Sequence, residues 1–130
     1  MAVTHSTAAR NAATDAVTAL IGASGKLVFR ISPSTVASPG TAVATLSFSS
    51  TAFGASSSGT ATANAITADT NATGNASPVA FATMQTSGGT IVVQCSVAAS
   101  GSDINMTNGL TVAAGDTVSC SSLTYTALSA

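Results

Sequence analysis

Charged residues are nearly missing from this chain of 130 residues. It has three Lys or Arg residues, four Asp, no Glu, and a formal net charge of −1. A free soluble monomer normally carries about 25% charged residues, whereas this chain carries 5%. So few charges give neighbouring copies almost no electrostatic repulsion. The composition therefore favours a protein that works packed against other copies or against a larger particle.

Basic and aromatic residues are also scarce, which argues against a nucleic-acid partner. Arg10, Lys26 and Arg30 are the three Lys or Arg residues, too few to neutralise the several phosphates that useful affinity needs. The aromatic residues are four Phe and one Tyr, with no Trp, and they form no run on which bases could stack. We therefore expect no binding to nucleic acid.

Residue types that carry chemistry are few and scattered. His5, Cys95 and Cys120 lack the close spacing of zinc ligands. No G-x-S-x-G elbow occurs among the serines. A triad of His5, Asp15 and a serine stays an open alternative that no motif supports. We expect no enzyme, no catalytic residue, no metal and no cofactor.

Two partial motifs are better explained as turns. Gly22-Ala-Ser-Gly25-Lys26 is reminiscent of a phosphate-binding loop, but Leu27 follows the lysine where a Ser or Thr should ligate magnesium. Asp69-x-Asn71-x-Thr73-Gly74 matches the first half of an EF-hand loop, but Ala80 stands at the twelfth position in place of Glu. We interpret the first as a helix end and the second as a polar turn, with a weak calcium site as an open alternative.

The sequence shows neither a membrane span nor a signal peptide. No run approaches the ~18 apolar residues of a span, and residues 1–25 contain Arg10 and Asp15 with no basic stretch before an apolar core. We expect the protein to be made and used in the cytosol. In that compartment Cys95 and Cys120 are expected to be buried thiols and not a disulfide.

Residues 9–21 have the pattern of an amphipathic helix. Ser6 or Thr7 can cap its start, and Gly22 can end it. The apolar stripe widens toward Leu20 and Ile21, so we expect the C-terminal end of the helix to be the most deeply buried. The stripe has the i, i+3, i+4 spacing and consists of Ala9, Ala12, Ala13, Ala16, Val17, Leu20 and Ile21.

After Gly25 the apolar residues alternate with polar ones, as in strands with one buried face. In residues 26–31, Leu27, Phe29 and Ile31 share one face, and Lys26 and Arg30 share the other. The same alternation predicts strands at residues 42–49 and 90–97. Weaker strands are expected at residues 59–66, 79–84, 103–107, 110–112 and 117–128, the last with a bulge near 121–122.

The spacing of these strands predicts the fold class. Turn signals separate the strands, and residues 69–78 are expected to form an exposed loop. The pattern indicates a mainly β fold, an antiparallel β-sandwich or jelly roll with one short N-terminal α-helix. We expect a single domain, with residues 1–25 as the helix and turn and residues 26–130 as the β-sandwich.

Two features suggest where a partner could bind. Residues 79–82 are apolar on both faces, which fits either a central strand or a strand whose outer face meets a partner. The three cations fit either a solvated face or docking onto an acidic surface. The tentative partner contacts are Arg10, Lys26, Arg30, Ala80, Ala82 and Met84.

The order of elements resembles a family of small virion proteins of tailed bacteriophages. The resemblance spans nearly the whole chain and is one of pattern, without a catalytic motif or a functional residue to carry over. It is borne by Arg10-Asn11, Leu20-Ile21-Gly22, residues 25–31, 46–48, Phe53-Gly54 and 62–66, and by residues 101–106, 112–118 and 123–126. Relatives usually carry more charged and aromatic residues after the first strand than the filler at residues 33–40 provides.

The resemblance implies a structural role. Some members are capsid decoration or cement proteins with a jelly-roll-like sandwich. We therefore expect a protein of the virion surface, assembled in the host cytoplasm, that binds the major capsid protein and other copies of itself as a dimer or trimer. The alternatives are a tail, neck or head-fibre component, or a secreted adhesin or pilus-like subunit.

Overall fold

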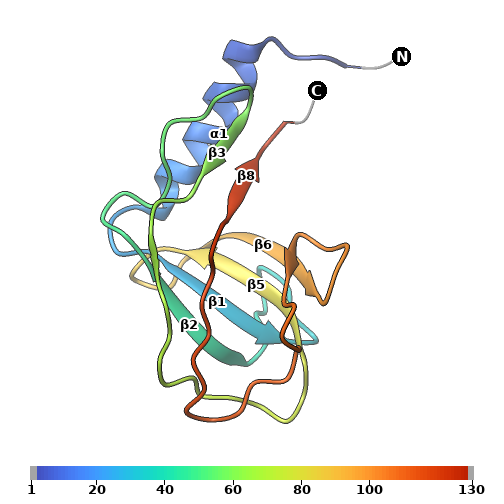
Figure 1. Cartoon of the computed structure of the whole chain (residues 1–130). Coiled ribbons are helices and arrows are strands. Elements are labelled where there is room, and N and C mark those ends of the chain that lie inside the picture. The colour runs from blue at the N-terminus through green and yellow to red at the C-terminus, as the bar shows by residue number, and fades with distance from the viewer. Residues whose placement is uncertain (1–2, 129–130) are drawn as a thin grey trace.

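The computed structural model describes residues 3–128. One helix, α1 (Thr7–Ile21), precedes a series of strands, so the chain is mainly β with one short helix, as predicted. Figure 1 shows α1, β3 and β8 standing above a curled sheet, which we call the body. The strands are β1 (Lys26–Ile31), β2 (Ala42–Phe48), β3 (Thr60–Thr62), β4 (Ile66–Thr67), β5 (Val79–Gln85), β6 (Ile91–Ala98), β7 (Ile104–Asn105) and β8 (Thr124–Thr126).

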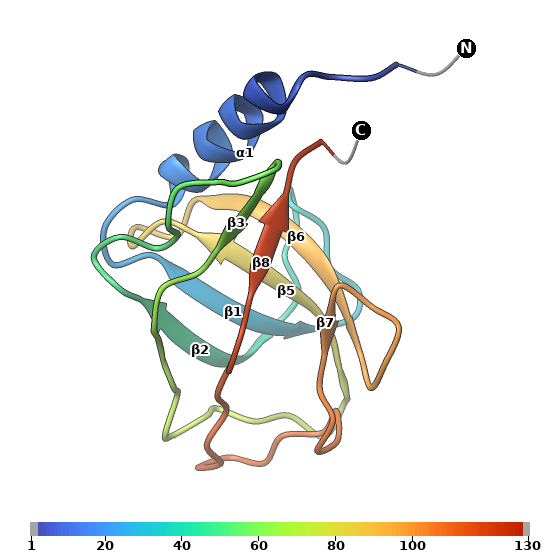
Figure 2. The same cartoon turned by 45° about the horizontal axis from the view of Figure 1, so that its top comes forward.

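The body is a six-stranded sheet in the order β4-β2-β1-β5-β6-β7. It curls into a half-barrel, with β7 at one edge (Figure 2). Its neighbours are antiparallel except β6 and β7, which pair in parallel, so the expectation of a purely antiparallel sheet is wrong for this pair. β3 and β8 form a separate two-stranded antiparallel sheet.

The core lies on the concave face of the half-barrel, where alternate residues of the long strands meet. Leu27 and Phe29 of β1 stand opposite Met84 and Ala82 of β5, and all four are buried. β5 lies between β1 and β6, so the central-strand interpretation of residues 79–82 is confirmed. Burial of these side chains provides the hydrophobic free energy that holds the sheet curled.

The convex face of the sheet carries polar side chains, and the segment 32–41 covers part of it. Lys26 and Arg30 share this face, as predicted, with the buried Val28 between them. The segment 32–41 contacts it through Ser34, whose Oγ donates to Gln94 Oε1 at 2.7 Å. The segment 32–41 therefore shields the part of the convex face around Arg30 from solvent.

Helix α1 begins and ends where predicted but buries a different face. Ser6 Oγ accepts from Ala9 N at 3.1 Å, and Gly22 follows the last turn with a φ of 70°. The buried residues are Thr14, Thr18 and Ile21, whereas Leu20 is 64% exposed. The expected stripe is therefore wrong at Ala9, Ala12, Ala16 and Leu20, which are exposed. Ile21 is 1% exposed and packs in the core, as expected for the C-terminal end of the helix, and the hydroxyl of Thr14 adds hydrogen bonds to the rest of the chain.

The weaker predicted strands differ most from the structure. Residues 59–66 contribute only β3 and the first residue of β4, residues 103–107 shorten to β7, and residues 117–128 shorten to β8. Residues 110–112 form no strand, and no strand spans the expected bulge at 121–122.

Residues 69–78 are mostly exposed, as expected, but their backbone is tied to distant segments. Ala72 N donates to Asp116 O, Gly74 N to Val43 O and Asn75 N to Val112 O, at 2.9 to 3.0 Å. Isolated hydrogen bonds of this kind do not require apolar and polar residues to alternate, so the sequence carries no signal that predicts them.

Candidate functional site

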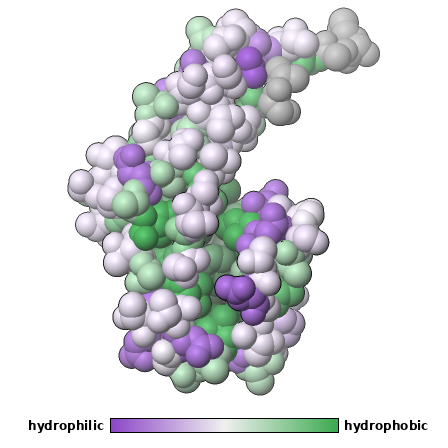
Figure 3. Space-filling model, viewed as in Figure 1, coloured by the Kyte–Doolittle hydropathy of each residue, from purple (hydrophilic) through white to green (hydrophobic). Residues whose placement is uncertain are grey.

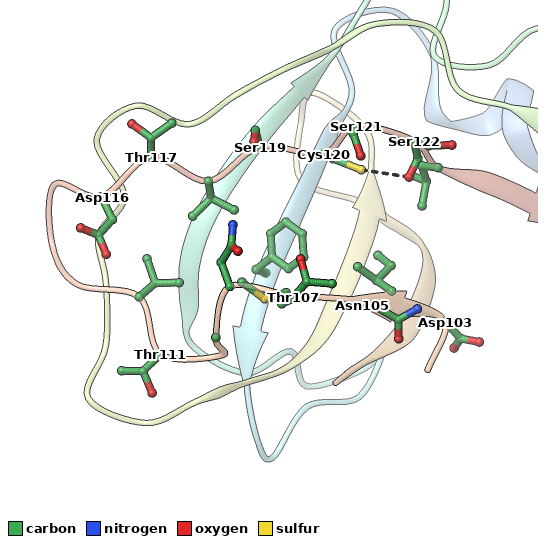
Figure 4. Close-up of a pocket in the computed structure, with 18 of the residues that line it drawn as sticks. Asp103, Asn105, Thr107, Thr111, Asp116, Thr117, Ser119, Cys120, Ser121 and Ser122 are labelled. Carbon is green, nitrogen blue, oxygen red and sulfur yellow. Dashed lines mark hydrogen bonds between the residues drawn. The ribbon is translucent and has the colours of Figure 1, made fainter. Parts of the chain in front are cut away.

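A groove of about 580 Å³ lies beside β7. Two segments border it, residues 103–112 and residues 116–124, and Phe29 of β1 lies at its base. Figure 4 shows Ser119 to Ser122 along one side, with Asn105 and Thr107 on the other. In Figure 3, strongly hydrophobic residues are visible in the hollow of the body.

The groove has an apolar floor and a polar rim. Phe29, Val112, Val118 and Leu123 are buried members of the core that also line it. The exposed rim consists of hydroxyls, amides and two carboxylates, from Asp103, Asn105, Thr107, Asn108, Thr111, Asp116, Thr117, Ser119, Ser121, Ser122 and Thr124. Such a lining can bind a segment that presents apolar groups downward and hydrogen-bonding groups sideways.

The two carboxylates at the rim already hold backbone turns. Asp103 Oδ2 accepts from Ser96 N at 3.0 Å, and Asp116 Oδ2 accepts from Ala113 N at 2.9 Å. Both also add negative charge to a groove whose lining contains no Lys, Arg or His. The groove therefore favours an occupant without acidic side chains.

Cys120 is the thiol that lines the groove. Burial raises the pKa of Cys120, against a smaller lowering contribution from a backbone hydrogen bond at Ser122. Cys95 is also a free thiol, and both cysteines are half-buried, so the expectation of buried thiols is met only in part. Because a raised pKa keeps a thiol protonated, Cys120 is a poor nucleophile at neutral pH.

The three predicted basic contacts lie away from the groove and bind uncharged oxygens. Arg10 Nη1 donates to Ser58 O at 3.2 Å, and Lys26 Nζ donates to Ser47 Oγ at 2.9 Å. Both side chains are half-buried, so part of each is exposed to solvent.

Arg30 makes a fuller set of hydrogen bonds. Its Nε donates to Thr83 Oγ1 at 3.0 Å, its Nη1 to Gly40 O at 2.8 Å and its Nη2 to Gln85 Oε1 at 3.0 Å. Burial lowers the pKa of Arg30, although a guanidinium remains charged at any ordinary pH. Arg30 thus links the segment 32–41 to β5. The alternation of apolar and polar residues in the sequence did not indicate this role.

The predicted apolar contacts of β5 differ in burial. Ala82 and Met84 are 0% and 4% exposed and belong to the core. These two cannot form an exposed contact surface, because their alternation with Thr83 places them on the concave side. Ala80 is half-buried and stays a candidate.

The two partial motifs behave as turns. Gly22 N donates to Ala19 O at 3.2 Å and ends the helix. Asp69 uses both carboxylate oxygens on backbone donors, Asn71 N at 3.0 Å and Thr45 N at 2.8 Å. No group of three or more metal-ligating side chains that could hold an ion occurs within residues 3–128.

A polar contact between α1 and the turn at residues 56–59 was missed by the sequence reasoning. Asn11 Oδ1 accepts from Gly59 N at 2.8 Å, and Asp15 Oδ1 accepts from Ser56 N at 2.9 Å. Thr14 Oγ1 donates to Gly59 O at 2.6 Å. The spacing of these polar residues at i, i+3 and i+4 was the available signal, and it is the same spacing used to place the alanines.

No protein-family model, no curated protein and no solved structure matches this chain. No helix within the described residues is long and apolar enough to cross a membrane. Function is therefore inferred from the chain's own residues and their geometry.

Proposed function

We propose that this chain is a capsid decoration, or cement, protein of a tailed bacteriophage. It binds the outside of the assembled shell and bridges neighbouring subunits of the major capsid protein. The observation that carries the proposal is the composition, with 5% charged residues and a surface of Ser, Thr and Ala. Such a surface loses little hydration free energy when it is covered, whereas a charged surface loses much.

The contact surface in this proposal is the exposed face of α1. It presents Ala12, Ala16, Ala19 and Leu20, all exposed. In both views α1 stands out from the body, with the N-terminal segment extending beyond it (Figures 1 and 2). Arg10, Lys26, Arg30 and Ala80 remain secondary candidates, through the parts of their side chains that are not buried.

A protein of this kind stabilises a shell by mass action. If it binds only the expanded shell, every bound copy lowers the free energy of that state relative to others. Shell symmetry would place dimers or trimers at the symmetry axes. In this proposal the β3–β8 pair, which contacts α1, belongs to the second layer of an open sandwich of the jelly-roll type.

Copy number in the particle tests the location. Quantitative mass spectrometry of purified particles of the encoding phage, against the major capsid protein, should give a ratio near one or a simple fraction of one. A few copies per particle would instead support a tail, neck or head-fibre component. Absence from the particle would contradict both.

A pair of substitutions tests the surface. Leu20→Asp places a charge on the exposed face of α1, and Val36→Asp places one on the segment 32–41, where Val36 is 55% exposed. We expect Leu20→Asp to abolish rebinding to particles stripped of the protein, and Val36→Asp to leave it unchanged. Equal rebinding by both variants would contradict the assignment of this face.

A further inference from the structure

An Asn-Gly pair, Asn108 and Gly109, lies in the turn that follows β7. Residues 107–109 are all exposed, and none of them makes a hydrogen bond within the described part of the chain. The backbone is bonded on both sides of this turn. Met106 N donates at 2.8 Å to the last carbonyl of β6, and Leu110 O accepts at 2.9 Å from the first N–H of β5. The turn can therefore change its conformation without breaking a hydrogen bond.

The backbone nitrogen of Gly109 is accessible. Gly109 has a φ of 109°, and a Cβ built on it would have no heavy atom within 4 Å, so no neighbouring segment packs against that side of the residue. Its N–H has no acceptor among residues 3–128. Because glycine has no side chain and a wide choice of backbone angles, this nitrogen can approach the side chain of Asn108.

The other five of the six asparagines in the sequence lack this combination, and each of them is followed by Ala or Met. Asn71 is exposed and its amide is unbonded within the described residues, but the next N–H, that of Ala72, donates to Asp116 O at 3.0 Å. Side-chain amides already engaged in a hydrogen bond belong to Asn11, Asn64, Asn75 and Asn105. Asn108 thus differs from all the others in having an unbonded amide directly before an unbonded glycine N–H.

These are the conditions for attack of the backbone on an asparagine side chain. The nitrogen of Gly109 loses its proton to water or hydroxide and attacks Cγ of Asn108. The N–Cγ bond forms, the Cγ–Nδ2 bond breaks, and the amide nitrogen leaves as ammonia, so that a cyclic imide remains. Water then opens the imide, at Cγ to give aspartate or at the backbone carbonyl carbon to give isoaspartate. Water is the only co-reactant, and nothing is oxidised or reduced. The two reacting groups are neighbours in the chain, so no bimolecular encounter is needed.

We propose that Asn108-Gly109 is a self-modifying site, at which the folded chain converts Asn108 to isoaspartate or aspartate with loss of ammonia. Asn108 lines the groove beside β7, so the product adds a carboxylate to those of Asp103 and Asp116. It also adds a negative charge to a chain whose formal net charge is −1. The modified groove therefore repels an acidic occupant more strongly than the unmodified groove does. The inference uses this chain alone and stands independently of the capsid proposal.

Incubation of the purified full chain at about pH 8 tests the proposal. Ion-exchange chromatography should resolve a growing acidic form that is heavier than the starting chain by about 1 dalton. Peptide mapping should place the change at Asn108, with isoaspartate and aspartate as separate products. A synthetic peptide of residues 103–112 is the reference for an unrestrained turn. The folded chain should convert within about tenfold of the rate of this peptide, because no hydrogen bond has to break first.

Two variants separate this site from other asparagines. Asn108→Gln keeps an amide but moves it one carbon further from the backbone, so that attack would have to close a larger ring, and the acidic form should be lost. Asn71→Gln is the matched control, because Asn71 is also exposed with an unbonded amide within the described residues. This control should become acidic at the wild-type rate. Both positions are exposed, and circular dichroism checks that both variants keep the fold.

Asn108→Asp serves as the marker of the modified chain. It should elute with the aspartate form and unfold at the same urea concentration as the wild type, because the side chain of Asn108 makes no hydrogen bond among residues 3–128. The proposal is overturned by a folded chain that converts more than about tenfold more slowly than the peptide. An acidic form that maps to another asparagine, or one that appears as fast in Asn108→Gln as in the wild type, would overturn it too.

Discussion

Thr14 joins three segments of the chain through a single buried hydroxyl. Its Oγ1 donates to Gly59 O at 2.6 Å and accepts from Ala127 N at 3.1 Å, and the residue is 0% exposed. Thr14→Val keeps the shape of the side chain but leaves both backbone groups unpaired. We expect the free energy of unfolding, measured by urea titration, to fall by about 2 kcal/mol.

The control for this prediction lies one helical turn away. Thr18 is also buried, but its Oγ1 donates only to Asp15 O of the same helix, at 3.3 Å. Thr18→Val should change the free energy of unfolding by less than about 0.5 kcal/mol. Equal losses from the two substitutions would show that the hydroxyl of Thr14 is not the group that holds α1 in place.

Cys95 makes stability depend on pH in the alkaline range. Burial, and then the negative charge of Asp103, raise the pKa of Cys95 from an ordinary 9.0 to about 11. The folded chain thus holds this proton more tightly than the unfolded chain does. Its contribution to stability is fully present below pH 9 and is lost as the pH rises toward 11.

The measurement compares wild type with Cys95→Ala. Urea titrations at several pH values from 8 to 11 should show a steeper loss of stability in the wild type, because the variant lacks the titrating thiol. In parallel, alkylation of Cys95 in the folded protein should accelerate throughout this range without reaching a plateau. Identical pH slopes for the two proteins would contradict the assignment.

At the scale of elements, the junction of α1 and β1 depends on a residue with no side chain. A Cβ added at Gly25 would lie 2.3 Å from Ile21 Cγ2 and 2.9 Å from Gln85 O. Ile21 is itself almost fully buried, so it has little room to move. Gly25→Ala should therefore lower the free energy of unfolding by about 1 to 3 kcal/mol.

Gly88 provides the matched control in the turn between β5 and β6. A Cβ there would meet only Thr86 Oγ1, at 3.8 Å, which is an ordinary contact. Gly88→Ala should be neutral or stabilising by up to about 1 kcal/mol, because it restricts the unfolded chain. A loss at Gly88 as large as the loss at Gly25 would show that close packing is not the cause.

The elements that could be predicted are those whose burial follows a simple period. β1, β2, β5 and β6 lie within one residue of the predicted bounds, because their apolar residues recur with the simple period of a strand. The face of α1 was not predictable from apolar spacing, since Thr14 is buried by its hydrogen bonds. The groove was missed because isolated contacts build it: Val118 bonds to Asp69 and Leu123 to Ala63, far apart in sequence.

At the scale of the molecule, the Lys, Arg and Asp side chains bind neutral groups and not one another in the hydrogen bonds of the described residues. Arg10, Lys26 and Arg30 donate to backbone carbonyls, hydroxyls and an amide. The aspartates in turn accept mainly from backbone N–H groups, as Asp69 does from Thr45. Each charge thus anchors a turn or a strand edge, and the fold is held by the core and by neutral hydrogen bonds.

This use of charge predicts a stability that is nearly independent of salt. Screening by salt weakens interactions between separated charges, and none of the described cations has a carboxylate as its hydrogen-bond partner. Between about 10 and about 300 mM NaCl, the free energy of unfolding should change by less than about 0.5 kcal/mol. Urea is the appropriate denaturant, because guanidinium chloride would itself screen the charges. A change of more than about 1 kcal/mol would mean that long-range interactions between the seven charged side chains hold the fold together.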